Sequence, residues 1–467
     1  MPSRQEDFHS VRLCPNIMIE DIQLLHQRIQ EIHPNPYIYV SKEAYDIALK
    51  LTLSKVSKEL TPYQFSMCVA QFLHGIQDSH TNINPRDLVF MKHSKSYLFP
   101  FSVRRIDNKF YLQKSVQNEI PLGVEILSLN HLHVDSIFKV AQQFSFMEGE
   151  SIEARDEVAS KMMGMIFNLM NNKYDVECRY KTIQGDTVQK TLQPMTVKSF
   201  KKLKNWYSEE KMYHFFDTQN RGILVIPTFE PRSLKLYKRE LDAFFANVKA
   251  NNCKEVIIDL RDNRGGLIRA QEYLISFLNT AQKNHPINYL YKRSKFDRFS
   301  LLPFYQKKQF VRRAKRVYPK GIISQEYDFY KKEFGELDTI LYDYIPRNRL
   351  EYSYNGNTTL IINGLSMSAS AMFAAWFKEN EKGKIIGTPC MGTMSGTFGN
   401  SATIYLKNTG FPVMISSLKF TPQSQSEIQK TGILPDVLID LKLEELIQKE
   451  DPIFKFLNIQ PQRARIR

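Results

Sequence analysis

The sequence predicts an α/β protein that is preceded by a helical segment and a β-rich segment. Over residues 206–446, short apolar runs typical of buried strands alternate with amphipathic runs typical of helices. This alternation indicates a sheet covered by helices. Two of the strand patterns end in small residues immediately before a helix, and such turns leave side chains and backbone N–H groups accessible.

Residues 1–95 are expected to form an N-terminal helical domain. Apolar residues recur at helical spacing over 21–32, and two prolines then end the run. Two further amphipathic helices are predicted over 41–58 and 62–76. His80 would lie on the loop that leaves this bundle.

Residues 96–200 are expected to form a small β-rich subdomain. Two strand patterns, 103–106 and 110–116, flank an Asp-Asn pair that signals a hairpin. The stretch 121–137 resembles the centre of a PDZ domain, with His131 where a glycine would stand. PDZ domains bind peptide C-termini as an added strand. Because the segment is short and degenerate, we expect a PDZ-like remnant or a structural subdomain rather than a working peptide-binding module.

Residues 201–467 are expected to form the α/β core. The apolar runs within it are bounded by turn residues, and the longer amphipathic runs have helical periodicity. Strands are predicted at 223–227, 256–260, 360–362, 384–386, 403–406 and 413–416, and helices at 234–250, 269–280 and 371–379.

A basic and aromatic insertion is expected at about 285–355. Residues 291–320 hold eleven Lys or Arg and one acid, Asp297, interleaved with Phe and Tyr. Together with the net charge of +15 this pattern suits binding of single-stranded nucleic acid. We favour a helical insertion whose aromatic side chains pack inward and whose charges face solvent. A lid that attracts acidic peptides is a sharper hypothesis.

The composition is that of a globular protein of two or three domains. The chain has 467 residues, 42% hydrophobic and 24% charged. No apolar run approaches the roughly eighteen residues of a transmembrane helix, and the N-terminus lacks the apolar core of a signal peptide. The compartment stays open: periplasmic or cell envelope if a signal peptide has been removed, and otherwise cytoplasmic.

The five cysteines are scattered and show no C-x-x-C spacing. This excludes a recognisable disulfide framework or zinc site. We predict neither a metal nor an organic cofactor.

Ser368 is the most informative candidate residue. The run over 361–371 breaks at Gly364 into small residues, and a helical pattern begins at Ala371. A serine hydroxyl at such a turn, beside free backbone N–H groups, suits a nucleophile and the oxyanion that it generates. About a hundred residues earlier, a buried strand ends at Gly265 and Gly266 before another helix.

These segments resemble the signatures of the tail-specific, or C-terminal processing, serine peptidases, the family that includes the tricorn core protease. Residues 258–266 match I-D-L-R-x-N-x-G-G, and 366–371 resemble S-A-S-A-S-E, whose middle serine, the nucleophile, falls on Ser368. Residues 386–389 and 432–436 look like the I-G-x-P and G-I-x-P-D elements. The resemblance implies a crotonase-like α/β core that hydrolyses peptide bonds.

The general base expected from this resemblance is His80. Many members use a lysine at the position of Thr393, and a threonine hydroxyl cannot take a proton near neutral pH. Residues 78–80 look like the D-x-H element of the tricorn-like branch, which uses a Ser-His-Glu triad, and histidine is a natural base near pH 7. The competing interpretation is a histidine that only caps its own helix.

The resemblance also points to an orienting acid, an accessory serine and oxyanion donors. Glu427, the one carboxylate in 421–430, stands at the position of the family's glutamate, although an isolated acid is more often a solvated surface residue. Ser79 takes the place of the accessory serine. The expected oxyanion hole consists of the backbone N–H of Ala369 and that of Gly265 or Gly266, since glycine permits close approach.

Three functions are compatible with the sequence. The first is a serine endopeptidase or C-terminal processing peptidase acting on peptides or proteins through Ser368, His80 and Glu427. The second is a catalytically silent relative that binds peptides or ligands, because Thr393 and Ala371 depart from the family pattern. The third, a nucleic-acid-binding protein, rests on charge alone, and we do not expect a nucleic-acid partner.

Overall fold

The computed structural model describes most of the chain. The described residues are 5–92, 97–99, 101–115, 119–171, 175–196, 198–199, 211–278, 285–297, 299–317, 321–344, 351–422 and 428–459. Within these ranges, no helix combines the length and the apolar character that crossing a bilayer requires.

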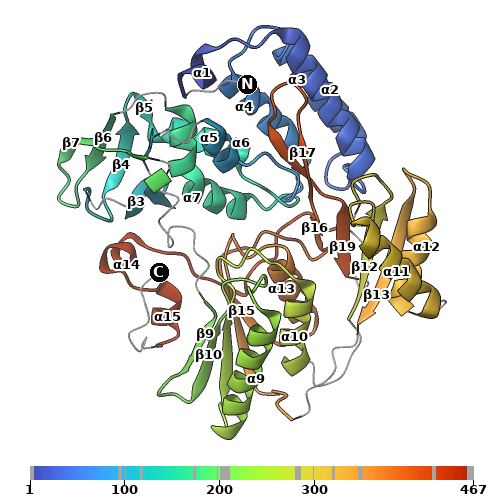
Figure 1. Ribbon diagram of the computed structural model, residues 1–467. Coiled ribbons are helices and arrows are strands. Elements are labelled where there is room, and N and C mark those ends of the chain that lie inside the picture. Colours follow the sequence, from blue (N-terminus) through green and yellow to red (C-terminus); the bar gives the residue numbers. More distant parts are fainter. Residues whose placement is uncertain are drawn as a thin grey trace.

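A six-stranded, mainly parallel sheet forms the centre of the C-terminal half (Figure 1). Its strands are, in spatial order, β20 (Val437–Leu438), β15 (Gly383–Gly387), β14 (Asn357–Ile362), β11 (Glu255–Asp259), β10 (Arg221–Val225) and β9 (Tyr213–Phe216). β9 runs antiparallel to β10, and the other neighbours are parallel. Because parallel strands end at the same edge, the segments that follow β11 and β14 leave the sheet side by side.

Helices cover both faces of this sheet. The elements are α9 (Leu234–Ala250), α10 (Ile268–Leu278) and α13 (Ala369–Glu379) on one face, with α14 (Leu443–Gln448) and then α15 (Pro452–Phe456) near the end of the described chain. Leu224 of β10 packs in the core formed with α9, α10 and α13, whereas Ile223 and Val225 pack with α15. Burial on both faces explains why these strands are continuous apolar runs.

A four-stranded antiparallel sheet extends from this core toward the N-terminal helices (Figure 1). Its order is β13 (Leu337–Tyr344), β12 (His285–Lys292), β19 (Leu418–Pro422) and β16 (Thr397–Gly399). Two helices, α11 (Phe304–Val317) and α12 (Gly321–Lys331), connect β12 to β13. β16 and β19 therefore come from the core, whereas β12 and β13 come from the basic insertion.

The expectation of a purely helical insertion is wrong, because two of its segments are long strands. β12 pairs with β19 and thereby joins the insertion to the core sheet. Phe299 is buried against Phe329 and Tyr291, but Phe304 and Tyr305 are exposed. The aromatic side chains thus pack inward only in part.

The N-terminal part contains five helices in the described residues. They are α1 (Gln5–Ser10), α2 (Pro15–Ile32), α3 (Lys42–Lys55), α4 (Pro62–His74) and α5 (Pro85–Lys92). A capping box between Thr61 and Gln64 starts α4. The hairpin of β17 (Ala402–Tyr405) and β18 (Pro412–Ile415) packs into the core of this bundle. A segment of the C-terminal half therefore completes the N-terminal core, as Figure 1 shows beside α2 and α4.

The next part of the chain combines an antiparallel sheet with two helices. The elements are β1 (Tyr97–Leu98), β2 (Phe101–Ile106), β3 (Lys109–Ser115), β4 (Glu125–Leu129), β5 (Leu132–His133), α6 (Val134–Phe144), α7 (Ile152–Met170), β6 (Val176–Lys181), β7 (Thr187–Leu192) and β8 (Met195–Thr196). The sheet order is β2-β3-β4-β6-β7, with β5 on β4 and a separate β1-β8 pair. Asp107 and Asn108 both have positive φ, as the predicted hairpin turn requires.

The two helices in this β-rich segment were not expected. Buried side chains of α6 recur every three or four residues, which is helical spacing. Residues 134–137, the end of the stretch that resembles the centre of a PDZ domain, are therefore the first turn of α6. In the core, by contrast, each predicted strand and helix has a counterpart within a few residues of its predicted ends.

We expect the attachment of the hairpin to α2 to depend on Asp21. This fully buried carboxylate accepts the N–H groups of Asn408 and Thr409, at 2.9 and 3.0 Å, and the hydroxyl of Thr409 at 2.7 Å. Asp21→Ala leaves these donors buried without a partner and should lower the free energy of unfolding by about 2–3 kcal/mol. Denaturant-induced unfolding measures this. Gln23→Ala, which alters an exposed residue of the same helix, should change it by less than about 0.5 kcal/mol.

Candidate active site

Ser368 occupies a sharp turn between β14 and α13. Its backbone has φ 55° and ψ −123°, a conformation that residues with a Cβ rarely adopt and that costs about 1–3 kcal/mol. The N–H of Met372 donates to the carbonyl of Ser368 at 2.9 Å, so the helix begins here. The N–H of Ala369 belongs to the first helical turn, whose N–H groups have no partner within the helix. The turn thus joins a serine hydroxyl to the N-terminus of a helix.

The turn that follows β11 packs directly against Ser368. Gly265 has φ 88°, and a Cβ built on it would lie 2.6 Å from the Cβ of Ser368 and 2.8 Å from the nitrogen of Ala369. Its N–H donates to Oδ1 of Asn263 at 2.9 Å, and the carbonyl of Asn263 accepts the N–H of Met367 at 3.1 Å. Only glycine fits between these two turns.

A pocket of about 180 Å³ opens beside Ser368. One side comes from the turns and helices of the core, and the other from β16 and β19 with the residue after β16. Gly266, in this lining, has φ 137°, and a Cβ on it would lie 2.4 Å from the nitrogen of Glu230. The lining residues are Gly266, Ile268, Ser368, Ala369 and Met372 on the core side and Thr397, Gly399, Asn400 and Phe420 opposite.

His80 lies on the loop that leaves α4, as predicted. Its backbone N–H donates to Oδ1 of Asp78 at 2.8 Å, and its carbonyl accepts the hydroxyl of Ser401 at 2.9 Å. Two residues further, Asn82 pairs with Met414 of β18 through both backbone groups, at 3.1 and 2.9 Å. The hairpin β17–β18 therefore holds the histidine loop in place.

The side chain of His80 is half-buried, and one of its two ring nitrogens has a hydrogen-bond partner. Its Nδ1 lies 2.9 Å from Oγ of Ser79. The same Oγ donates to Oε2 of Glu148 at 2.6 Å. Among the described residues, the other ring nitrogen, Nε2, has no hydrogen-bond partner and is available as a base.

Glu148 lies on the loop between α6 and α7 and is completely buried. Its Oε1 accepts the hydroxyl of Tyr39 at 3.0 Å and the N–H of Phe398 at 3.2 Å. Its Oε2 accepts the hydroxyl of Thr397 and the N–H of Ser79, both at 3.3 Å, besides the Ser79 hydroxyl. Burial and the negative charge of Asp78 raise the pKa of Glu148.

Lys419 provides a buried positive charge next to this carboxylate. Its Nζ lies 3.3 Å from the hydroxyl of Tyr39 and 4.7 Å from the ring centre of Phe398. Burial lowers the pKa of Lys419, and the negative charge of Glu148 opposes that change. Since strand residues alternate between faces, Lys419 points away from the face where Phe420 lines the Ser368 pocket.

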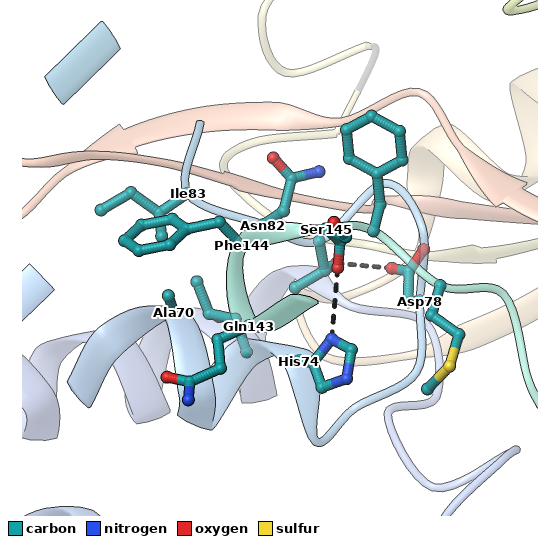
Figure 2. A pocket seen from close by; sticks show the side chains of 12 residues that line it. Ala70, His74, Asp78, Asn82, Ile83, Gln143, Phe144 and Ser145 are labelled. Carbon is teal, nitrogen blue, oxygen red and sulfur yellow. Dashed lines mark hydrogen bonds between the residues drawn. The ribbon is translucent and has the colours of Figure 1, made fainter. Parts of the chain in front are cut away.

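Asp78 faces into the protein interior. Its Oδ2 lies 3.0 Å from Nε2 of His33 and accepts the hydroxyl of Thr81. Burial alone would raise the pKa of Asp78, but the hydrogen bond and charge of His33 outweigh it and lower the pKa to about 2. Figure 2 shows the small cavity, about 10 Å³, that Asp78 lines together with His74, whose Nδ1 lies 3.2 Å from the carbonyl of Ser145. Through its bonds to His80 and Thr81, Asp78 fixes the conformation of the loop that carries His80.

β16 and the residues after it connect the Ser368 pocket to the loop of His80. Thr397 lines the Ser368 pocket and also donates to Glu148, which is bonded to Ser79 beside His80. Asn400 lines the same pocket, and the next residue is bonded to the histidine loop. In the part of the chain that the structure describes, no hydrogen bond joins Ser368 to His80.

The acid expected from the resemblance, Glu427, lies outside the described residues. Just after it, the N–H of Gln429 donates to the hydroxyl of Ser395 at 2.6 Å, and the carbonyl of Lys430 accepts the N–H of Glu150 at 2.7 Å. The chain near Glu427 is thus anchored beside the loop that carries Glu148.

No lysine replaces the family's base at the expected position. Thr393 is buried, and its hydroxyl donates to the carbonyl of Gly396 at 3.1 Å. Lys384 is exposed near the start of β15, whereas Ser368 follows the end of the neighbouring strand β14.

Glu148 is the residue of this site that sequence reasoning missed. It stands in a short loop without a motif, and its neighbour Glu150 is exposed. Its signal exists only in three dimensions, because its side-chain donors Tyr39, Ser79 and Thr397 lie 109, 69 and 249 positions away in the chain.

One cluster in the described residues has the residue types of a metal site. Side-chain ligand atoms of Asp78, His80 and Glu148 lie within 4.8 Å of one another. The carboxylate oxygens already accept hydrogen bonds from the protein, and Nδ1 of His80 is bonded to Ser79. These groups therefore form a hydrogen-bond network that needs no ion to satisfy it.

A comparison with protein families finds one family to which the core is similar. Residues 220–439 match the model of peptidase family S41. No curated protein matches the chain. The α/β core of this chain is therefore similar to peptidase family S41.

Solved structures share this fold at low sequence identity. A crystal structure of a CPAF mutant matches with a TM-score of 0.68 and 13% identity, covering 93% of this chain and 94% of the other. Mature CPAF complexed with lactacystin matches with a TM-score of 0.66 and 13% identity, covering 95% and 97%. The similarity therefore extends beyond the family match to nearly the whole chain.

We expect Gly265→Ala to disable Ser368. The added Cβ would collide with Ser368 and with the N–H of Ala369, so the turn must shift. Reaction of Ser368 with a fluorophosphonate probe should slow at least tenfold. Gly335→Ala is the matched control, because Gly335 also has positive φ but a Cβ there meets no atom of the described residues within 4 Å.

Proposed function

We propose that this protein hydrolyses peptide bonds through an acyl-enzyme, with Ser368 as nucleophile, His80 as general base and Glu427 as orienting acid. The observation that carries this proposal is the strained turn of Ser368, which lies at a helix N-terminus, packed on a glycine turn and open to a pocket. Strain of this kind persists only where the surrounding structure enforces it, and it is concentrated at functional sites.

In the first step, Oγ of Ser368 bonds to the carbonyl carbon of the substrate, and its proton moves to Nε2 of His80. The carbonyl oxygen becomes an oxyanion. His80 then gives the proton to the leaving nitrogen as the C–N bond breaks. A water molecule, deprotonated by His80, attacks the ester, and Ser368 recovers its proton from His80 as the acid product leaves.

We assign the oxyanion to the N–H groups of Ala369 and Gly266. Ala369 opens α13, where the helix dipole favours negative charge. Gly266 lines the pocket, whereas the N–H of Gly265 is already donated to Asn263. This favours Gly266 over Gly265 as the second donor.

Substrate binding must complete the arrangement. Ser368 and His80 are not hydrogen-bonded in the described residues, and catalytic hydrogen bonds are often long before a substrate binds. The assignment of Glu427 rests on its place five residues before Gly432, which pairs with Thr393. A silent peptide-binding relative is the alternative, favoured by Thr393 and Ala371.

Labelling by a fluorophosphonate probe near pH 8 tests the proposal. Wild type should be labelled, Ser368→Ala should not, and His80→Ala and Glu427→Gln should be labelled at least a hundredfold and about tenfold more slowly. Ser370→Ala removes a neighbouring buried hydroxyl that has no hydrogen-bond partner among the described residues, and this variant should react like wild type. Folded wild type that stays unlabelled and cleaves no peptide would favour the silent relative.

We also expect cleavage that does not depend on a free peptide C-terminus. In the PDZ-like segment, a Cβ on Gly164 of α7 would lie 2.0 Å from the carbonyl oxygen of Phe101 in edge strand β2, so helix and strand are in direct contact. Just before β2, the N–H and C=O of Phe99 are bonded to Asn168, at 2.6 and 2.9 Å. These contacts block the groove and the edge that a peptide would join.

The test compares cleavage of two peptides of the same sequence, one with a free C-terminus and one with an amidated C-terminus. The kcat/KM values should agree within about threefold. A tenfold preference for the free carboxylate would instead indicate recognition of C-termini.

A further inference from the structure

The buried groups behind His80 form a continuous chain of hydrogen bonds. It runs from His80 to Ser79 at 2.9 Å and from Ser79 to Glu148 at 2.6 Å. It continues from Glu148 to Tyr39 at 3.0 Å and from Tyr39 to Lys419 at 3.3 Å. The general base is thus connected to a buried carboxylate and, beyond it, to a buried ammonium.

The donors around Glu148 define its protonation state. Two backbone N–H groups and the hydroxyls of Tyr39 and Ser79 point at its two oxygens. The Thr397 hydroxyl lies 3.3 Å from Oε2 and 3.1 Å from the carbonyl of Phe398. An ionised carboxylate accepts hydrogen bonds on both oxygens and donates none, so this surrounding suits the charged form. Burial and the negative charge of Asp78 act against the charge, and Lys419 offsets part of their effect.

The direction of each hydrogen bond then follows. The Ser79 hydroxyl has one proton, and it donates that proton to Glu148, the stronger acceptor. The same oxygen can only accept from His80, so the proton of the neutral imidazole must be on Nδ1. Nε2 is then the basic nitrogen, as a base for Ser368 requires.

We propose that Glu148 is a positioning residue, whose carboxylate acts through Ser79 to keep the proton of His80 on Nδ1. The proposal rests on the proposed function for its catalytic consequence, although the state of the histidine is measurable without catalysis. With Nδ1 bonded to Ser79 and Nε2 needed for Ser368, the role left for Glu427 is to stabilise the imidazolium by its charge. Glu148 supplies a second carboxylate, on a different segment of the chain, that determines the tautomer.

The test is ¹⁵N spectroscopy of histidine-labelled full-length protein at pH 8.5. Comparison with His80→Gln identifies the signals of His80. Wild type should show a protonated Nδ1 and an unprotonated Nε2. In Glu148→Gln and in Ser79→Ala the protonated fraction at Nδ1 should fall at least twofold. Glu150→Gln, an exposed acid two positions away, should leave the spectrum as in wild type.

Kinetics provide the second measurement. Glu148→Gln should lower kcat of peptide cleavage by about 10- to 100-fold with KM changed less than threefold, because the base is misdirected while the pocket is intact. Ser79→Ala should give a similar loss. Ser79→Ala leaves the bonds from Tyr39, Thr397 and Phe398 to Glu148 in place. If Glu148→Gln does not fold, Ser79→Ala therefore tests the proposal by itself.

The outcomes separate the two proposals. An unchanged His80 tautomer in both variants overturns the role of Glu148, even if activity falls, because that loss would then reflect structure alone. A changed tautomer in a protein whose wild type neither reacts with the probe nor cleaves peptides supports the role of Glu148 and counts against the peptidase.

Discussion

The close contact between two strand-to-helix turns is the constraint on which the site depends. β11 and β14 are parallel neighbours, so the turns that follow them meet at one edge of the sheet. Gly265 lets them approach until only a hydrogen atom fits between its Cα and Ser368. This contact supports a backbone conformation at Ser368 that would be unfavourable in isolation. The conformation of Ser368, the proposed nucleophile, thus depends on the sheet topology as much as on the serine itself.

The proposed base, His80, belongs to a different part of the molecule, and the antiparallel sheet connects that part to the core. β16 and β19 start in the core and run to the N-terminal helices, where hairpin β17–β18 is bonded to the loop of His80. The charges of Asp78, Glu148 and Lys419 are buried along this route. Buried charges persist only when other groups compensate them, so the three make the position of the loop sensitive to every member of the network.

Sequence periodicity identified the core well and the added segments less well. The strands of the α/β core are buried on both faces and stand out as apolar runs between turn residues, and β12 and β13 did not stand out because their aromatic and charged residues are interleaved. α6 was not expected, because it follows directly on a short strand within the stretch that resembles a PDZ domain. The mixed α/β fold is confirmed, whereas the domain boundaries and the Ser-His-Glu triad stay predictions.

The sequence by itself determined the elements whose signal is local: the turn at Ser368, the paired glycines and the histidine loop, each encoded by consecutive residues. Only the tertiary structure decided which of them meet and what surrounds them. Glu148 carries no local pattern, because its role arises from donors on segments up to 250 positions away. A buried carboxylate is stabilised by whatever groups the fold brings to it, and no stretch of the chain contains that information alone.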